Sequence, residues 1–428
     1  MRKIQNFEQL SSSETRKTAL EIAEAGLWAI DTPTIVRKGI RIENSTLFIQ
    51  NRAFSLKDVR NVYVVGIGKC ALAACSALEE VLGDRIAGGI VLDIKEGALE
   101  RLRLLVGDHP FPTERNAKAT AEIITLLKVL EQDDLVLFVV SGGGSTLLCQ
   151  PESLSCQDEA AIVSSLFRAG ATIQELNIVR KHLSLARGGY LAMHAYPARS
   201  ISLIFSDVPG DNMEFIASGP TIKDTTKKED AEQILKKYSV LETCVIPKIT
   251  LLETPKEGKY FKNVTNILFV SNGVALEAMA EKAKELGFHA KIRTSVLTGE
   301  ARDVAKTIVE DLQKAAPRTV LLYGGETTVT IKHPGKGGRN LELGLSSLRF
   351  LQEGHVLLPL ASDGRDNTDF AGAICDMITK KKALDENLSL EEYLENNRSY
   401  DFFERVQEYL LCGNTGSNVS DLIIAIRE

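Results

Sequence analysis

The feature that most constrains this chain is a repeated junction, at which a short apolar run stops at glycine, serine or an acidic residue. Val64-Val65 runs into Gly66-Ile67-Gly68-Lys69, and Val139-Val140 runs into Ser141-Gly142-Gly143-Gly144-Ser145. Three further runs stop at Ser206-Asp207, at Gly324-Gly325-Glu326 and at Ser362-Asp363. Short apolar runs suit buried parallel strands, and ligands bind beyond the carboxyl ends of such strands. The junctions therefore predict an α/β protein with its site at these strand ends.

Helical segments separate the apolar runs along most of the chain. Residues 70–82, 117–130 and 159–169 have helical periodicity, and a second series has helices at 273–286 and 301–315 and strands at 266–270 and 319–323. Strands that alternate with helices indicate βαβ units. We therefore predict two Rossmann-like α/β domains with mainly parallel sheets.

The chain of 428 residues is too long for one ordinary hydrophobic core, which also favours two domains. Residues 223–257 are rich in lysine, threonine and glutamate and contain Pro247 and Pro255, a composition typical of a linker. We place an N-terminal domain at residues 1–240 and a C-terminal domain at residues 255–428. Residues 410–428 could pack back on the N-terminal domain.

Composition narrows the classes of protein further. Hydrophobic residues make up 44% of the chain and the net charge is −6, which argues against nucleic acid or anionic lipid as a partner. No apolar stretch approaches the roughly 18 residues that span a bilayer, and residues 1–17 lack the apolar run of a secretory signal. The seven scattered cysteines include no CxxC pair, so we expect neither a disulfide framework nor a structural zinc site. We expect a cytoplasmic protein, and a homodimer stays open.

The residues at the predicted strand ends suit phosphoryl transfer. Glycine lets the backbone approach an anion, and adjacent N–H groups supply donors. Lys69 adds a mobile positive charge, and the carboxylates of Asp207, Glu326 and Asp363 suit Mg²⁺. Lys336 and Arg339 stand in a glycine-rich loop before a predicted helix, where guanidinium matches phosphate oxygens. Phosphoryl transfer needs little beyond such positioning, charge neutralisation and a metal. Taken singly, however, a glycine pair is often a tight turn and a strand-end aspartate is often a helix cap.

A dehydrogenase is the strongest alternative to a kinase. Gly66-x-Gly68-x-x-Ala71 satisfies the relaxed dinucleotide fingerprint, and Asp93 lies about where an acid would hold a ribose hydroxyl. Lys69 beside the supposed pyrophosphate and the four other polar strand ends argue against this interpretation. A non-catalytic protein that binds a sugar acid is a third alternative. Neither a Walker A motif nor the glycine-rich motif of protein kinases occurs, so a kinase would belong to neither class.

Several long blocks resemble the glycerate 2-kinase family, also known as type II glycerate kinases, with DUF4147 and MOFRL domains. The blocks include VVGIGKCA at 64–71, DHPFPTERN at 108–116, DDLVLFVVSGGGSTLL at 133–148, GATIQELNIVRKHLSLARGGYLA at 170–192, GGETTVTIKHPGKGGRNLEL at 324–343 and SDGRDNTDFAGA at 362–373. The resemblance implies that ATP, with Mg²⁺, phosphorylates D-glycerate at its 2-hydroxyl, which gives 2-phosphoglycerate and ADP. It also implies an active site in a cleft between the two domains. NAD(P)-dependent hydroxypyruvate reductase, or a kinase of a related sugar acid, remains the alternative.

The resemblance also suggests roles for individual residues. The lysine and arginine that are central in the family correspond to Lys69 and Arg339, and we add Asp207 as the third catalytic candidate. Arg180 and Lys181 are candidates for holding the substrate carboxylate, and Glu326 and Asp363 for holding the metal. The remaining candidates for binding substrate or phosphate are Gly68, Ser141, Gly142, Gly143, Gly144, Ser145, Gly325, Lys336 and Asn340.

The chain departs from the family pattern in three places. The family usually reads Asp-Gly-x-Asp-Gly-x-Thr where this chain has Arg365 and Asn367 within SDGRDNT, and Asn414 stands where proline is usual. Arg187 follows Ala186 where the family usually has lysine. These changes could alter which acid is recognised, and they leave the expectation of phosphoryl transfer in place.

Overall fold

A computed structural model describes residues 2–243 and 249–428, which form two compact units. Unit 1 comprises Met1–Asp31, Asp207–Asp211 and Val270–Glu428, and unit 2 comprises Thr32–Ser206 and Asn212–Phe269. This division differs from domains at residues 1–240 and 255–428, because the first 31 residues pack with the C-terminal part of the chain. Residues 410–428 belong to unit 1 as well. The predicted linker contains a helix of unit 2, α10 (Lys228–Lys237), and its Pro247 lies outside the described residues.

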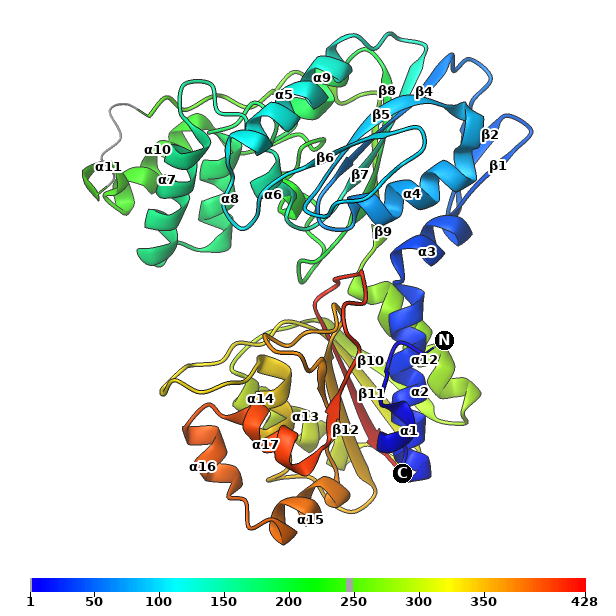
Figure 1. The fold of residues 1–428 in the computed structure, drawn as a ribbon, viewed down its shortest axis with the longest axis vertical. Coiled ribbons are helices and arrows are strands. Elements are labelled where there is room, and N and C mark those ends of the chain that lie inside the picture. The colour runs from blue at the N-terminus through cyan, green and yellow to red at the C-terminus, as the bar shows by residue number, and fades with distance from the viewer. Residues whose placement is uncertain (1, 244–248) are drawn as a thin grey trace. The chain divides into compact units, whose positions relative to one another are not determined.

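Unit 2 is built on a six-stranded sheet with the order β6-β5-β4-β7-β8-β9 (Figure 1). These strands are β4 (Asn61–Ile67), β5 (Ile86–Asp93), β6 (Arg103–Val106), β7 (Asp134–Val140), β8 (Arg199–Phe205) and β9 (Val264–Val270). The strands from β6 to β8 pair in parallel. All seven residues of β7 are buried, as expected for an apolar strand covered on both faces. The predicted parallel sheet is confirmed here.

Helices and a small hairpin sheet complete unit 2. The longer helices are α4 (Ala71–Leu82), α5 (Glu114–Lys128), α7 (Cys156–Arg168) and α8 (Ile173–Lys181), and the shorter ones are α3 (Thr32–Gly39), α6 (Gly144–Leu147), α9 (Tyr190–Ala195) and α11 (Val240–Thr243). The small sheet has β1 (Ile40–Glu43), β2 (Thr46–Ile49) and β3 (Arg52–Ser55) in this order. Thr113, Ser155 and Thr172 form capping boxes at the starts of α5, α7 and α8. Helices α7, α8 and α10 share an apolar core of their own.

The sheet of unit 1 is mixed, so the prediction of a mainly parallel sheet is wrong for this unit. Its order is β10-β11-β15-β12-β13-β14, with β10 (His289–Leu297), β11 (Thr319–Gly325), β12 (His355–Ala361), β13 (Gly372–Ala373), β14 (Tyr409–Leu410) and β15 (Asp421–Arg427). Only the β10–β11 pair is parallel. The last strand of the chain, β15, inserts between β11 and β12 and is antiparallel to both. Local sequence periodicity does not reveal such an insertion.

Helices flank this sheet on two sides (Figure 1). On one side α2 (Glu14–Ala29) packs on α12 (Asn272–Glu285), and on the other lie α13 (Ala301–Lys314) and α14 (Arg339–Ser347). The remaining helices are α1 (Phe7–Leu10), α15 (Met377–Asp385), α16 (Leu390–Glu395) and α17 (Ser399–Val406). Arg16 of α2 is buried and forms ion pairs of 2.6 Å with Asp376 and 2.6 Å with Glu408. The N-terminal helix is therefore tied to unit 1 by packing and by charge.

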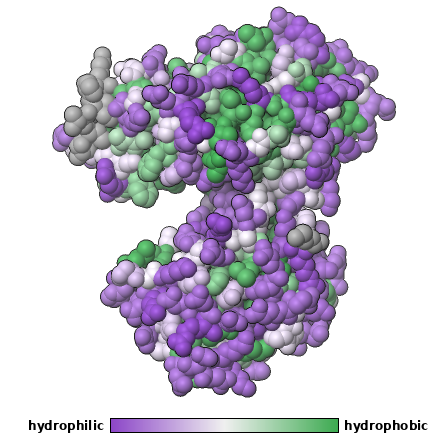
Figure 2. Space-filling view, viewed as in Figure 1, coloured by the Kyte–Doolittle hydropathy of each residue, from purple (hydrophilic) through white to green (hydrophobic). Residues whose placement is uncertain are grey.

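The surface in the view of Figure 2 is predominantly hydrophilic, with scattered hydrophobic patches. Among the described residues, no helix combines the length and the apolar character that crossing a bilayer requires.

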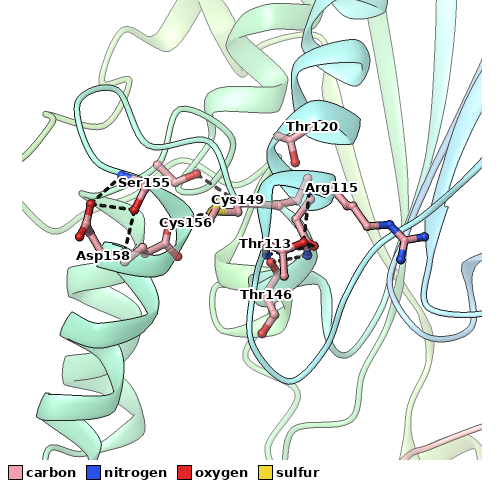
Figure 3. Close-up of a disulfide and its surroundings, with 12 residues drawn as sticks. Thr113, Arg115, Thr120, Thr146, Cys149, Ser155, Cys156 and Asp158 are labelled. Atoms are coloured by element: carbon pink, nitrogen blue, oxygen red, sulfur yellow. Dashed lines mark hydrogen bonds between the residues drawn. A yellow bond between two sulfur atoms is a disulfide. The ribbon is translucent and has the colours of Figure 1, made fainter.

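One disulfide occurs against expectation, between Cys149 and Cys156 (Figure 3). It joins the segment that follows α6 to the first residue of α7. The two cysteines stand seven positions apart, a spacing that matches no common motif, so no sequence pattern indicates that they pair. The pairing depends on how the chain turns between the two helices, which only the fold decides.

Candidate functional site

The junction between β4 and α4 is locked to the end of β7. Gly68 has a φ of +117°, and a Cβ atom there would lie 2.1 Å from the Ser141 hydroxyl oxygen. The Lys69 N–H donates to the Gly142 carbonyl at 3.0 Å, and the Cys70 N–H donates to the Ser141 hydroxyl at 3.4 Å. Gly68 and Ser141, which we predicted to bind substrate, thus join two strand ends, and Ser141 is only 3% exposed.

Asp93 caps α4, and its hydrogen bonds argue against a dinucleotide site at the junction of β4 and α4. Its Oδ2 accepts the Leu72 N–H at 2.8 Å, and its Oδ1 accepts the Ile94 N–H at 2.6 Å and the Lys95 N–H at 3.1 Å. The carboxylate is fully buried. A dinucleotide site needs a free acid for the ribose and a free helix N-terminus for the pyrophosphate. In this protein the acid already accepts backbone N–H groups, and one of those N–H groups belongs to the N-terminus of α4.

The glycine loop after β7 offers free backbone donors instead. The Ser141 N–H donates to Ile67 and the Gly144 N–H to Ser141. The N–H groups of Gly142, Gly143 and Ser145 have no acceptor within the described part of the chain. Gly143 is left-handed, with φ +81° and ψ −12°. Successive free N–H groups in such a turn can bind an anion, so the loop stays a candidate for holding phosphate.

Lys69 lies over the glycine loop. A Cβ atom on Gly143 would stand 3.0 Å from the Lys69 Cγ and 3.1 Å from its Cε, so the aliphatic part of the lysine packs on this glycine. The side chain is exposed, and its ammonium has no hydrogen-bond or ion-pair partner among residues 2–243 and 249–428. A mobile, unpaired positive charge therefore stands beside three free N–H donors.

Arg180 and Lys69 lie close enough to His109 for their charges to affect the pKa of this histidine. Partial burial, and then the positive charges of Lys69 and Arg180, lower the pKa of His109. Burial, and then the charge of Arg187, lowers the pKa of Arg180 to about 10. Within the described residues no side chain pairs with Arg180. His109 was missed as a site residue, although it stands in the DHPFPTERN block, because a lone histidine carries no spacing signal.

Lys181 does not share the surroundings of Arg180. It is 2% exposed, and its Nζ lies 3.1 Å from Asp224 Oδ1 and 3.5 Å from Glu214 Oε2. Neighbouring residues on a helix point in different directions, so the pair cannot act as one clamp on a carboxylate. Lys181 thus forms a buried ion pair that our substrate-binding prediction did not anticipate.

In unit 1, Arg339 is held by two carboxylates. Its Nε lies 2.5 Å from Asp421 Oδ2, and its Nη1 lies 3.0 Å from Glu326 Oε1. Burial lowers the pKa of Arg339, but the hydrogen bond to Asp421 and the charges of Asp421 and Glu326 outweigh it and raise the pKa. The guanidinium therefore stays charged in a fixed orientation, and Glu326, a metal candidate from the sequence, is already paired with it.

Asn340 and two buried carboxylates support this arginine. The Asn340 Nδ2 donates to Asp366 Oδ1 at 3.2 Å and to Asp421 Oδ1 at 2.9 Å, and Asn340 is 1% exposed. Asp366 Oδ2 accepts the Leu341 N–H at 2.8 Å and so caps α14. Burial, and then the charge of Asp421, raises the pKa of Asp366 to about 7. The roles of Asp366 and Asp421 are not among those predicted from the sequence, although an aspartate that opens an apolar run is a visible signal for Asp421.

The other predicted residues of unit 1 lie in varied surroundings. Lys336 Nζ lies 3.3 Å from the centroid of the Tyr400 ring. A Cβ atom on Gly325 would stand 2.2 Å from the Leu297 carbonyl oxygen, so this glycine permits close backbone packing. Asp363 Oδ1 accepts the Arg365 N–H at 3.0 Å, and the Asp207 carbonyl accepts the Ser420 hydroxyl at 2.9 Å. Within residues 2–243 and 249–428, no group of three or more His, Cys, Asp or Glu side chains could hold a metal ion.

The protein is of the α/β class, and its glycine loop carries three backbone N–H groups that have no acceptor among the described residues. A family model described as a domain of unknown function, DUF4147, matches residues 18–253, and the model of the MOFRL family matches residues 319–421. A glycerate 2-kinase of Pyrococcus horikoshii is 36% identical over 96% of this chain and 97% of its own length. A D-glycerate 2-kinase of Thermotoga maritima is 38% identical over 86% of this chain and 91% of its own length.

A solved structure agrees with these relatives. The crystal structure of a glycerate kinase from Thermotoga maritima has a TM-score of 0.86 and 34% identity, and the match covers 96% of this chain and 99% of that chain. The chain therefore belongs to the glycerate 2-kinase family, in which a DUF4147 part is followed by a MOFRL part.

Proposed function

We propose that the protein transfers the γ-phosphoryl group of ATP to D-glycerate, at the 2-hydroxyl, to give 2-phosphoglycerate and ADP. The observation that carries this proposal is the unpaired Lys69 ammonium above the free N–H groups of Gly142, Gly143 and Ser145. Such a site suits an anion, and the relatives named glycerate 2-kinase supply the class of reaction. ATP as donor fits a cytoplasmic location, which is part of the proposal.

In the proposed mechanism, fixed positive charges neutralise the phosphoryl group during transfer. Lys69 and the loop N–H groups hold phosphate oxygens, and Arg339, oriented by Asp421 and Glu326, binds oxygens of the transferring group. Lys69 belongs to unit 2 and Arg339 to unit 1. Asp207 is our candidate for accepting the proton of the attacking hydroxyl.

Mg²⁺ is part of this proposal as a companion of the nucleotide. Magnesium in such sites is usually bound by one or two protein carboxylates together with substrate phosphates and waters. The donor set fits that limited role, since Asp363 is half-buried and keeps its Oδ2 outside any hydrogen bond among the described residues. Glu326 can contribute only by sharing its carboxylate with Arg339. Bound Mg²⁺ would neutralise phosphate charge and supply a Lewis acid.

The test is turnover of ATP with D-glycerate in two variants, with phosphorus NMR to identify the product. Lys69→Ala and Arg339→Lys should each lower kcat by about 100-fold or more, the usual effect of losing one group that stabilises transition-state charge. Arginine to lysine at position 339 keeps a charge opposite Asp421, so that the fold is preserved. Lys57→Ala, at an exposed lysine of unit 2, is the matched control and should leave kcat unchanged. Near-normal rates in Lys69→Ala would remove this lysine from the mechanism.

A further inference from the structure

A cavity of about 420 Å³ lies in unit 2 beside the glycine loop. Its apolar wall includes Phe111, Val163, Phe167 and Leu176, and its polar part includes Ser145 and Arg180. The volume falls within the range of small-molecule sites, roughly 300–1,000 Å³. Helix α7 supplies Val163 and Phe167, while Leu176 and Arg180 come from α8.

Two exposed aromatic rings border this cavity. Phe111 is 61% exposed and Phe167 is 72% exposed, and no other phenylalanine among residues 2–243 and 249–428 is exposed. Covering exposed aromatic surface with a ligand is favourable, and aromatic rings stack well on planar heterocycles. The two phenylalanines that are exposed in the described part of the chain thus line one cavity, which suits a planar, apolar ligand group.

The cavity also carries an unbalanced positive charge. Arg168, Arg180 and Glu159 line it; Arg180 forms no ion pair or side-chain hydrogen bond among the described residues, whereas Glu159 lies 2.6 Å from Arg187. A half-buried guanidinium without an ion-pair partner would be stabilised by a ligand that supplies an anion. The complete ligand is therefore expected to be apolar at one end and anionic at the other.

The cavity is continuous with the anion-binding loop. Ser145 and Thr146 line it, and Ser145 also provides one of the free N–H groups of that loop. Two contacts hold the segment that follows the loop. Asn116 of α5 donates to the Thr146 carbonyl at 3.2 Å, and the Cys149–Cys156 disulfide links this segment to α7 (Figure 3). Unit 2 thus contains, as neighbours, the apolar wall, Arg180, the free N–H groups of the glycine loop and Lys69.

We propose that this cavity binds the base and ribose of the nucleotide, with the base against Phe111 and Phe167 and with Arg180 facing the phosphates. The proposal rests on the kinase function above and specifies where its donor binds. The acid substrate is a poor occupant by comparison, since a three-carbon acid with hydroxyl groups gains nothing from four apolar side chains.

The test compares ATP with inorganic tripolyphosphate, which has the phosphates but no base. Phe167→Ala and Phe111→Ala should weaken ATP binding about 5- to 100-fold, the usual effect of removing one aromatic stacking partner. Binding of tripolyphosphate and the KM for D-glycerate should stay unchanged, and kcat at saturating ATP should stay near the parent value. Arg180→Gln should weaken ATP and tripolyphosphate binding alike.

Val129→Ala is the matched control, because Val129 is 71% exposed, follows the last residue of α5 in the same unit and lies outside the cavity. It should leave both affinities unchanged. Unaltered ATP affinity in both phenylalanine variants would overturn the proposal, as would a rise in the KM for D-glycerate alone. If the parent protein formed no ADP with D-glycerate, the proposed function would fail, while the two binding measurements would still decide what the cavity holds.

Discussion

At the scale of single residues, some charged side chains pair with other groups of the protein, whereas others have no partner among the described residues. Asp93 and Asp366 each accept backbone N–H groups at the start of a helix, so both are caps. Lys181 forms an ion pair with Asp224, whereas the side chains of Lys69 and Arg180 have no partner among the described residues. Unpaired cations beside free N–H groups suit an anionic ligand, which is why the proposed site is placed there.

The raised pKa of Asp366 leads to a prediction about pH. The folded pKa of about 7 exceeds the ordinary value of about 3.9, so the folded state holds a proton that the unfolded state has released between these values. The contribution of Asp366 to stability is therefore full below about pH 4 and is lost as the pH rises toward 7, by up to about 1.4 kcal/mol per pH unit.

Urea unfolding of the parent and of Asp366→Asn between pH 4 and 8 tests this prediction. The free energy of unfolding should fall with pH more steeply in the parent than in the variant, and the difference should level off above about pH 7. Asp369→Asn, at a nearby exposed position, should reproduce the parent curve. Parallel curves for the parent and Asp366→Asn would show that Asp366 ionises normally.

At the scale of elements, the disulfide holds the end of the glycine loop to α7. Cys149 follows α6, and Cys156 is the first residue of the helix that carries Val163 and Phe167. The Thr120 hydroxyl of α5 adds a hydrogen bond to the Leu147 carbonyl at 3.3 Å. The position of the loop is therefore set by three connected elements, α5, α6 and α7, rather than by the loop itself.

Removal of the disulfide should destabilise unit 2 moderately. Loop-closure entropy for a ring this short gives about 2 to 3 kcal/mol. We expect Cys156→Ser to lower the free energy of unfolding by about that amount, and a reducing agent to do the same to the parent protein. The reducing agent should have no effect on Cys156→Ser, which serves as the control. Equal stability of the parent with and without reductant would mean that the bond contributes nothing.

At the scale of the whole molecule, the two units do not follow the order of the chain. The N-terminal α2 packs on α12, and its Arg16 pairs with Asp376 and Glu408, so the first 31 residues complete the C-terminal unit. Loss of this arginine would remove one charge partner from each of two buried carboxylates and leave Glu408 paired with Lys382 and Asp376 with the Ile378 and Thr379 N–H groups. Breaking such buried pairs typically costs up to about 3–5 kcal/mol.

Hydrogen exchange measured by mass spectrometry tests this interleaving. In a variant that begins at Thr32, the backbone amides of Val270–Glu428 should lose protection, while those of Thr32–Ser206 should keep it, although the deletion adjoins the latter in sequence. Arg16→Ala should produce a weaker form of the same pattern. Arg37→Ala, which removes an exposed pair with Glu80, should change neither unit. Loss of protection confined to Thr32–Ser206 would contradict the division.

Local signals were enough to predict the α/β class, the parallel sheet of unit 2 and the glycine loop Ser141–Ser145, because apolar runs, helical periodicity and glycine clusters can be recognised in short segments. Three features depend instead on the folded chain: β15 inserts between β11 and β12, the N-terminal helix joins the C-terminal unit, and Cys149 meets Cys156. The folded structure also determines which polar side chains remain free to bind a ligand. Lys181 pairs with Asp224, and Asn340 donates to Asp366 and Asp421, so neither side chain is free, although both were predicted as site residues. Pairing between residues far apart in sequence leaves no local pattern, because it depends on where the folded backbone carries each side chain.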